Sequence, residues 1–291
     1  MSTITYAYHK CVAVVLRTLF PLALGTGPAK QDEVVQIPGR DGNSIKVNVY
    51  HSQAAKPSPV LINFHGSGWT ISMHGSDDEF VRRVAKETDC TVLDATYRLA
   101  PEYPYPAAVH DAEDVIKWVL ARPEQFDLSR LSISGFSAGG TLALVASSQS
   151  FPKETFRHLI TFYPPSDFET LPSMKVAPDS SGTPLPDWMA TIFTDSYAPP
   201  GVDRKDPKVS PCFSPPEDFP NDVVMITCAC DNLCPESEEL AQKIAAVPEK
   251  HVVCRRMEKC NHAWDKSTKP GTEGEKAKND AYDLAIETLR R

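Results

Sequence analysis

Residues 131–140 read Leu-Ser-Ile-Ser-Gly-Phe-Ser-Ala-Gly-Gly, an apolar strand followed by a glycine-rich turn and a stretch that favours a helix. The turn has the pattern G-x-S-x-G, with Ser137 at its centre. A serine on a sharp turn between a strand and a helix presents its Oγ atom clear of the backbone, and the flanking glycines avoid a Cβ clash. The strand before it (131–134) and the helix after it (138–147) favour a nucleophilic Ser137 over a serine that only caps a helix.

A nucleophilic serine also needs backbone N–H donors for the oxyanion, and an upstream loop offers them. The apolar run 59–64 reads as a buried strand and ends in His65-Gly-Ser-Gly-Trp69. This segment matches the H-G-G-G type of oxyanion loop, with a serine in place of one glycine. The N–H groups of Ser67 and Gly68, with that of Ala138 after the nucleophile, are therefore the expected oxyanion hole.

An acid and a histidine follow in the order that this chemistry requires, after the nucleophile. Asp231 stands at the end of the apolar strand 221–230, and active sites of open α/β sheets lie outside the carboxyl ends of strands. His262 stands in the loop after the next strand, 251–257. In such a triad the histidine takes the serine proton and the acid orients the imidazole.

Two other carboxylates lie close to these residues in the sequence. Asp265 comes after the histidine, and Glu236 is expected to lie in a helix already. Neither position suits the acid that orients the base, so the predicted catalytic residues are Ser137, Asp231 and His262.

These segments resemble the hormone-sensitive lipase family of α/β-hydrolase esterases, which includes arylacetamide deacetylase-like and carboxylesterase-like members. The most specific match is Tyr97-Arg-Leu-Ala-Pro-Glu-Tyr-Pro-Tyr-Pro-Ala-Ala108, which no general catalytic argument demands. The other matches, in the family's order, are His65–Trp69, Gly135–Gly140, Asp206–Pro211, Asp231–Leu233 and His262–Ala263. The resemblance covers the chain from about residue 60 onward and implies an α/β-hydrolase fold with esterase activity and no cofactor.

The chain departs from the family's pattern at three places. Phe136 replaces the acidic residue usual before the nucleophile, and Ser67 replaces a glycine of the oxyanion loop. The acid motif, usually opened by glycine and closed by Asp-Glu, here runs from Cys228 to Glu236. These changes bear on substrate preference and rate. Within the family signature, Arg98 and Glu102 are expected to form a scaffold ion pair.

Strands and helices alternate along the chain, which predicts a mostly parallel sheet with helices on both faces. The expected strands are 44–51, 59–65, 91–96, 131–135, 157–163, 222–230 and 251–257. The clearest expected helices are 76–88, 111–122, 138–149, 237–247 and 273–290. The strand 44–51 alternates polar and apolar residues, as an antiparallel edge strand does. At 291 residues with 41% hydrophobic content, the chain (1–291) can bury its core as one domain.

The segment 164–220 interrupts this alternation, with one expected helix at 185–197. Insertions this long are usually functional lids. The resemblance implies that it joins the N-terminal segment, about 1–30, as a cap over the active site. The stretch 6–24 is apolar but split by Arg17, which favours an amphipathic cap helix over a signal peptide or anchor. Side chains expected to line an apolar pocket are Trp69, Phe136, Trp188, Met189, Phe193 and Trp264.

The eight cysteines are expected to be free thiols in a reducing compartment, because the chain is large and lacks a convincing secretory signal. The group around Cys228, Cys230 and Cys234 lacks the usual zinc spacing on a turn, so no metal is expected. The net charge of −8 disfavours nucleic-acid and anionic-membrane partners. We expect a cytoplasmic protein without stable membrane insertion, with a secretory or membrane-associated alternative, and the sequence is compatible with a homodimer.

The sequence thus predicts a serine carboxylester hydrolase that cleaves short-chain, acetyl-like esters of a hydrophobic small molecule, such as a secondary metabolite. An amidase or deacetylase would use the same triad, and no residue separates the two leaving groups. A non-catalytic binder on the same fold is the second alternative, and the retained His262 argues against it.

Overall fold

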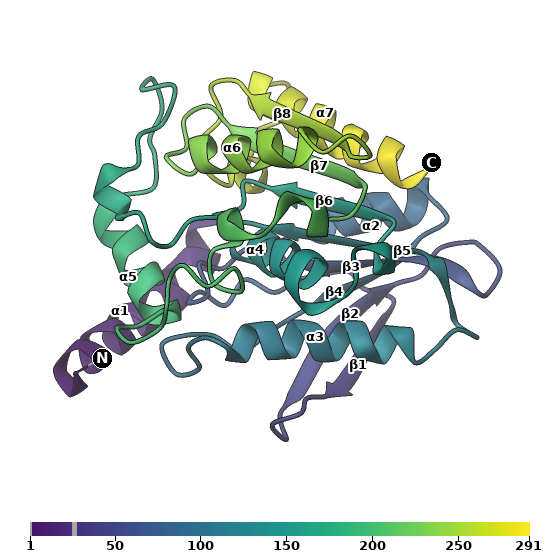
Figure 1. Cartoon of the computed structure of the whole chain (residues 1–291), viewed down its shortest axis with the longest axis horizontal. Helices are drawn as coiled ribbons and strands as arrows, with labels where there is room; N and C mark the ends of the chain where they lie inside the picture. Colours follow the sequence, from purple (N-terminus) through teal and green to yellow (C-terminus); the bar gives the residue numbers. More distant parts are fainter. Residues whose placement is uncertain (1, 25–27) are drawn as a thin grey trace.

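The computed structural model describes residues 2–24 and 28–291, and an eight-stranded mixed sheet forms its centre (Figure 1). The strand order is β1-β2-β4-β3-β5-β6-β7-β8. The strands are β1 (Glu33–Pro38), β2 (Ser44–Tyr50), β3 (Ser58–Phe64), β4 (Thr91–Ala95), β5 (Phe126–Phe136), β6 (His158–Phe162), β7 (Asp222–Cys228) and β8 (His251–Met257). β2 pairs antiparallel with β1 and β4, and the remaining pairs are parallel. The carboxyl ends of β3, β5, β7 and β8 therefore meet at one edge of the sheet.

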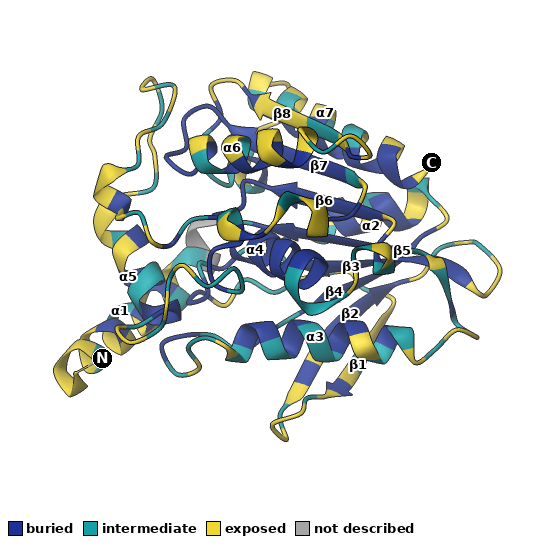
Figure 2. Ribbon diagram, in the orientation of Figure 1, coloured by how far each residue is buried: buried dark blue, intermediate teal, exposed yellow. Residues whose placement is uncertain are grey.

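Helices cover both faces of the sheet, and the buried residues lie between the helices and the strands (Figure 2). One face packs against α3 (Ala107–Leu120), α4 (Ala138–Val145) and α6 (Cys234–Ala245), and the other against α2 (Asp78–Glu87) and α7 (Glu273–Leu289). Alternate residues of β3 enter the two cores, with Ile62 and Phe64 on one side and Leu61 on the other. This period of two lets one central strand stabilise both layers.

The predicted mostly parallel sheet with helices on both faces is confirmed, but the prediction missed the strand β1 and the early start of β5. The strand at 44–51 is antiparallel, but it is not the edge strand, because β1 pairs outside it. Among the residues of β1 only Ile37 is buried, so the alternation that marks a strand is weak there. β5 begins at Phe126, five residues before the predicted start at 131, through the mostly polar run 127–130.

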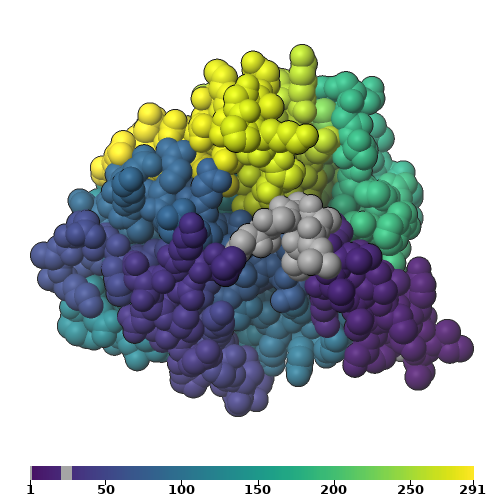
Figure 3. Space-filling model, turned by 180° about the vertical axis from the view of Figure 1, so that it is seen from behind, coloured from purple at the N-terminus to yellow at the C-terminus, as the bar shows by residue number. Residues whose placement is uncertain are grey.

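The N-terminal helix α1 (Thr3–Leu24) packs against α5 (Asp187–Tyr197), the one α-helix in the described segment 164–220 (Figure 3). Leu16 of α1 and Phe193 of α5 form a small apolar cluster with Ile71. Buried His9 hydrogen-bonds through Nδ1 to the Ser196 hydroxyl at 3.0 Å. Residues 1 and 25–27 of the predicted cap segment 1–30 lie outside the described residues.

Arg17 joins α1 to two loops of the main body. Its Nε donates to the Thr70 carbonyl at 2.8 Å, and an Nη group donates to the Ala100 carbonyl at 3.0 Å. Two further guanidinium hydrogen bonds, each 2.8 Å, reach the Glu102 carboxylate. Both side chains of this ion pair are 23% exposed, so the pair is only partly screened by water. Arg17, the charged residue that interrupts the apolar run of the N-terminal segment, therefore holds α1 against the main body of the protein.

Replacing Arg17 with methionine is expected to lower the free energy of unfolding by about 2 kcal/mol, because it leaves two carbonyls and a carboxylate without their donor. Urea denaturation of Arg17→Met and of the wild type measures the difference. Lys10→Met, which removes an exposed cation from the same helix, should change the stability little. Equal effects of the two substitutions would contradict a fastening role for Arg17.

The expected ion pair between Arg98 and Glu102 is wrong. Arg98 pairs with buried Asp111 at 2.9 Å and with Asp41 at 2.8 Å, while Glu102 binds Arg17. Asp111 also accepts the Arg98 backbone N–H at 2.7 Å, so the start of α3 is joined to the signature loop. Partners this distant in the chain leave no sequence pattern by which to find them.

All eight cysteines are free. Five of them are buried, Cys212 is half-buried, and Cys11 and Cys254 are exposed. Within residues 2–24 and 28–291, no helix combines the length and apolar character needed to cross a bilayer. No group of three metal-binding side chains is arranged around a common point in this part of the chain.

Candidate active site

Ser137 occupies the sharp turn between β5 and α4, with φ of 49° and ψ of −120°. Few L-residues adopt a positive φ, so the surroundings must hold this conformation. A Cβ on Gly135 would lie 2.2 Å from the Gly139 carbonyl oxygen, and one on Gly139 would lie 2.0 Å from the Phe64 carbonyl oxygen. The Ser137 N–H also donates to the Phe162 carbonyl at 2.8 Å. The G-x-S-x-G pattern is therefore a packing requirement of this turn.

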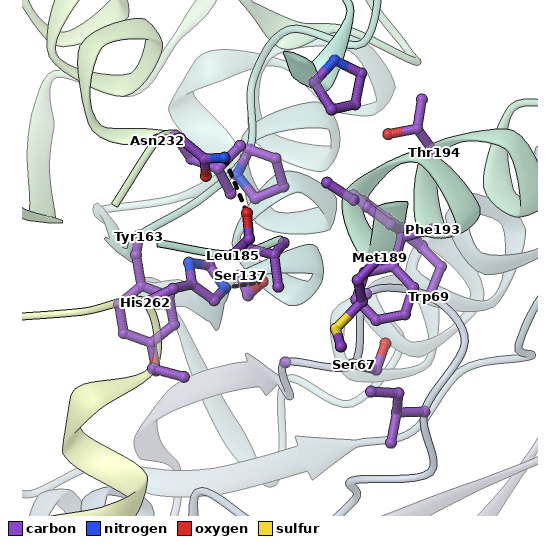
Figure 4. Close-up of a pocket in the computed structure, with 18 of the residues that line it drawn as sticks. Ser67, Trp69, Ser137, Tyr163, Leu185, Met189, Phe193, Thr194, Asn232 and His262 are labelled. Carbon is purple, nitrogen blue, oxygen red and sulfur yellow. Dashed lines mark hydrogen bonds between the residues drawn. The ribbon is translucent and has the colours of Figure 1, made fainter. Parts of the chain in front are cut away.

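The structure brings Ser137, His262 and Asp231 into one hydrogen-bonded row. The Ser137 Oγ lies 2.9 Å from His262 Nε2 (Figure 4), and His262 Nδ1 lies 2.6 Å from Asp231 Oδ2. The His262 side chain is 15% exposed and that of Asp231 is 1% exposed. When Nδ1 donates to the carboxylate, Nε2 carries a lone pair, which is free to accept a proton from the serine hydroxyl.

The pKa of His262 is raised above its usual value of 6.5. Burial alone lowers the pKa of an imidazole, but the charge of Asp231 and its hydrogen bond favour the imidazolium and outweigh burial. Asp265 adds a smaller contribution in the same direction. The site therefore stabilises the cation that forms when His262 takes a proton.

The two alternative carboxylates have other partners. Asp265 accepts hydrogen bonds from the hydroxyls of Tyr163 and Tyr282, each at 2.7 Å. Glu236 pairs with Lys175 at 2.5 Å and accepts the Ser166 N–H at 2.8 Å. Of these three carboxylates, Asp231 is the one that touches the imidazole.

The loop after β3 lies directly against Ser137. A Cβ on Gly66 would lie 3.3 Å from the Phe136 carbonyl oxygen, which is a tight contact, and 3.4 Å from the Ser137 Cβ. Gly68 has φ of 52°, and a Cβ there would lie 2.5 Å from the Phe193 ring of α5. Ser67 keeps a negative φ and thus tolerates its side chain.

The N–H groups of Ser67, Gly68 and Ala138 make no hydrogen bond to any described residue. Unpaired backbone donors beside a serine Oγ are the arrangement that an oxyanion requires.

An apolar pocket surrounds Ser137 and His262, with Trp69, Met189 and Phe193 on one side and Tyr163 and Leu185 on another (Figure 4). Of the side chains predicted for the pocket, Trp69, Met189 and Phe193 line it. Trp69 stacks on Tyr197 with ring centroids 4.3 Å apart, which fixes its plane.

Three of the predicted pocket residues, Phe136, Trp188 and Trp264, do not line the pocket. Trp188 lies at the start of α5 and is 55% exposed. Trp264 is buried against the Tyr163 ring, with centroids 5.7 Å apart. Whether such a side chain lines the pocket depends on the face of the short helix or strand from which it projects. The spacing of residues in the sequence does not predict that face.

Phe136 points into the core behind the nucleophile. Its ring stacks on Phe162 with centroids 4.2 Å apart, and the Lys266 ammonium lies 3.6 Å from its centroid. Lys266 is also paired with Asp77 at 2.7 Å and with Asp265 at 2.9 Å. At the position where the family usually has an acidic residue, this chain thus has an aromatic ring whose face attracts the Lys266 ammonium. The negative charges beside this ammonium come from Asp77 and Asp265.

The prediction missed several pocket residues. Ile71 and Met73 follow the oxyanion loop directly, and their position after it was a usable signal. Phe20 reaches the pocket from α1, while Asn232 and Leu233 follow Asp231. The contact of Phe20 depends on how α1 packs, and no local pattern predicts it.

A family model described as "alpha/beta hydrolase fold" matches residues 61–266, which include every residue of the hydrogen-bonded row and the oxyanion loop. The chain belongs to this α/β-hydrolase family. The match confirms the fold class and, together with the relatives, the resemblance to the hormone-sensitive lipase group of esterases.

Curated relatives and solved structures carry esterase names. Ethyl acetate hydrolase of Pseudomonas putida is 28% identical over 222 residues, covering 72% of this chain and 70% of that protein. Versiconal hemiacetal acetate esterase of Dothistroma septosporum is 27% identical over 237 residues, covering 75% and 71%. The structure of EstE1, a thermostable carboxylesterase from a metagenomic library, superposes with a TM-score of 0.82 at 26% identity, covering 97% and 96%. The prediction of a carboxylesterase-type enzyme is confirmed at this level.

Proposed function

We propose that this α/β hydrolase is a serine carboxylester hydrolase that works through Ser137, His262 and Asp231. The observation that carries the proposal is the row from Ser137 Oγ to His262 Nε2 at 2.9 Å and from His262 Nδ1 to Asp231 at 2.6 Å. A nucleophile, a base and an orienting acid in this geometry are the requirements of acyl transfer.

In this mechanism, Ser137 Oγ attacks the ester carbonyl while His262 Nε2 takes its proton. Asp231 holds the imidazole in the right tautomer and stabilises the cation. The N–H groups of Ser67, Gly68 and Ala138 bind the oxyanion, and each such donor is worth about 3 kcal/mol in the transition state. His262 then protonates the leaving alcohol, and a water activated by the same histidine hydrolyses the acyl-enzyme.

We further propose that the chain is one hydrolase domain whose cap combines the N-terminal segment, about 1–30, with the insertion 164–220. Phe20 of α1 and the Leu185–Phe193 part of the insertion line the pocket above the nucleophile, which supports this assignment. A cap of this kind excludes water and selects the substrate.

The substrate we propose is a short-chain, acetyl-like ester of a hydrophobic small molecule, such as a secondary metabolite. The pocket walls are mostly apolar, formed by Trp69, Ile71, Met73, Met189 and Phe193. The two relatives named for acetate substrates support a short acyl group. An amidase or deacetylase remains the alternative, because the same three residues cleave amides.

Labelling and matched substrates test the proposal. Wild-type protein is expected to react with a fluorophosphonate at one site, mapped by mass spectrometry to the peptide containing Ser137, and to hydrolyse p-nitrophenyl acetate. Hydrolysis of p-nitrophenyl acetate faster than of p-nitroacetanilide, compared by kcat/KM, supports an esterase, and the reverse order supports the amidase. Absence of both labelling and turnover would contradict the proposed function.

The activity is expected to fall at acidic pH with a midpoint above 6.5. Only neutral His262 accepts the serine proton, and its raised pKa moves protonation to higher pH than in a free imidazole. Below that midpoint kcat/KM should decrease about tenfold per pH unit, because one proton inactivates the site. A profile from pH 5 to 9 in buffers of constant ionic strength checks this, and a midpoint clearly below 6.5 would contradict the assigned role of Asp231.

A further inference from the structure

The serine that replaces a glycine in the oxyanion loop has a specific partner, Tyr97. The Ser67 Oγ lies 2.7 Å from the Tyr97 hydroxyl, and this hydroxyl lies 2.7 Å from the His65 carbonyl oxygen. Ser67 and Tyr97 are both buried, at 5% and 3% exposure. Tyr97 opens the segment after β4, so a neighbouring strand supplies this contact.

The direction of these hydrogen bonds follows from the number of protons. The Tyr97 hydroxyl has one proton, and the His65 carbonyl can only accept it. Ser67 must therefore donate to the Tyr97 oxygen. Burial raises the pKa of Tyr97 above its usual value, so the hydroxyl keeps its proton at working pH. The two hydrogen bonds therefore run in one direction, from Ser67 to Tyr97 and from Tyr97 to the His65 carbonyl. Consecutive hydrogen bonds of this kind polarise and strengthen one another.

The same segment holds the loop in two other ways. The rings of Tyr97 and His65 stack with centroids 4.6 Å apart and 13° between their planes. The Ala100 N–H donates to the Trp69 carbonyl at 2.7 Å. The loop is thus fixed at its first, third and fifth residues. The Ser67 hydroxyl donates its proton to the Tyr97 oxygen. The backbone N–H of Ser67 is therefore the donor that this residue can offer to the substrate.

We propose that Tyr97 is a positioning residue of the oxyanion hole, acting through the hydrogen bonds of its hydroxyl to the His65 carbonyl and the Ser67 side chain. The inference rests on the proposed function, since it concerns the donors that bind the oxyanion. It also gives the Ser67 departure a purpose, because a glycine would leave the third loop residue without this contact. Preorganised donors stabilise the transition state without reorganising during the reaction.

Tyr97→Phe tests the proposal, because it keeps the ring stacked on His65 and removes only the hydroxyl. We expect kcat for p-nitrophenyl acetate to fall about tenfold with KM unchanged. A trifluoromethyl ketone measures the same interaction directly: Ser137 Oγ adds to its carbonyl carbon, the proton goes to His262, and the resulting oxyanion occupies the hole. Its inhibition constant should rise by the same factor, about tenfold, in Tyr97→Phe. The inhibition constant of an uncharged alcohol that forms no oxyanion should not change.

Two comparisons separate positioning from a general loss of packing. Tyr105→Phe removes a hydroxyl from the same loop, where it only contacts Asp206 at 3.4 Å outside the pocket, and should leave kcat unchanged. Ser67→Ala should lower kcat in the same direction, and the double variant with Tyr97→Phe should be about as slow as Tyr97→Phe alone. Undiminished kcat and ketone affinity in Tyr97→Phe, or an equal loss in Tyr105→Phe, would overturn the inference. An inactive wild type would contradict the proposed function instead.

Discussion

Ser137→Ala is expected to lower kcat for p-nitrophenyl acetate by about six orders of magnitude and to abolish fluorophosphonate labelling. The substitution removes the oxygen that forms the acyl-enzyme in the proposed mechanism, and it leaves the turn and the imidazole in place. The variant should still hydrolyse the ester about 10³–10⁴ times faster than water alone, because the oxyanion hole and substrate binding remain. Turnover measured against titrated wild-type sites detects a loss of this size.

A matched serine controls for the surroundings of the nucleophile. Ser132→Ala alters the same strand, where the Ser132 hydroxyl contacts His158 at 3.1 Å away from the pocket, and should leave turnover unchanged. Equal turnover by Ser137→Ala and the wild type would exclude the acyl-enzyme mechanism. Full labelling of Ser137→Ala would show that another residue reacts.

The backbone of Ser137 adds a measurement that does not depend on activity. Its φ of 49° strains any residue with a Cβ, and such strain costs about 1–3 kcal/mol. Ser137→Gly should therefore have a higher free energy of unfolding than Ser137→Ala by about 1 kcal/mol, although both are inactive. Urea denaturation of the two variants measures this difference.

The parts of the site that the sequence predicted are those fixed by chain order and strand ends. Parallel strands bring their carboxyl ends to one edge, so Ser137, Asp231 and His262 had to meet once each followed its own strand. The glycines of the turn left little choice, because a Cβ there would overlap backbone atoms. The strand–helix alternation predicted the layers for a similar reason, since each element buries one face.

The missed parts depend on contacts between distant segments. Phe136 could enter the pocket or the core, depending on the face of β5 from which its side chain projects. In the structure its ring stacks on Phe162 in the core. Arg98 and Glu102 are four residues apart, yet they do not pair with each other. Arg98 pairs with Asp111, 13 residues later, and Glu102 pairs with Arg17, 85 residues earlier. The signature segment that had no catalytic explanation contacts the loop 65–69 through the hydrogen bond from the Tyr97 hydroxyl to the His65 carbonyl. Local sequence patterns do not indicate such contacts between separate segments, so they become visible only in the folded structure.

Asp231→Asn is expected to lower kcat by about 10⁴-fold while preserving the shape of the site. An asparagine side chain donates as well as accepts, so it can stabilise the imidazole tautomer with the proton on Nε2, which cannot accept the proton of Ser137. The variant also loses the charge that raises the pKa of His262, leaving burial to lower it. The acidic limb of the remaining activity should therefore move to lower pH than in the wild type.

Two results together test this role of Asp231. Asp265→Asn removes a carboxylate close to the same histidine, but one that binds the hydroxyls of Tyr163 and Tyr282. It should lower kcat far less than Asp231→Asn, because it leaves the 2.6 Å hydrogen bond to His262 Nδ1 in place. If Asp265→Asn were the slower variant, or if the acidic limb of Asp231→Asn did not move, the orienting acid would have to be reassigned. The expected order follows from which carboxylate touches the imidazole, since an acid acts on the tautomer only through that hydrogen bond.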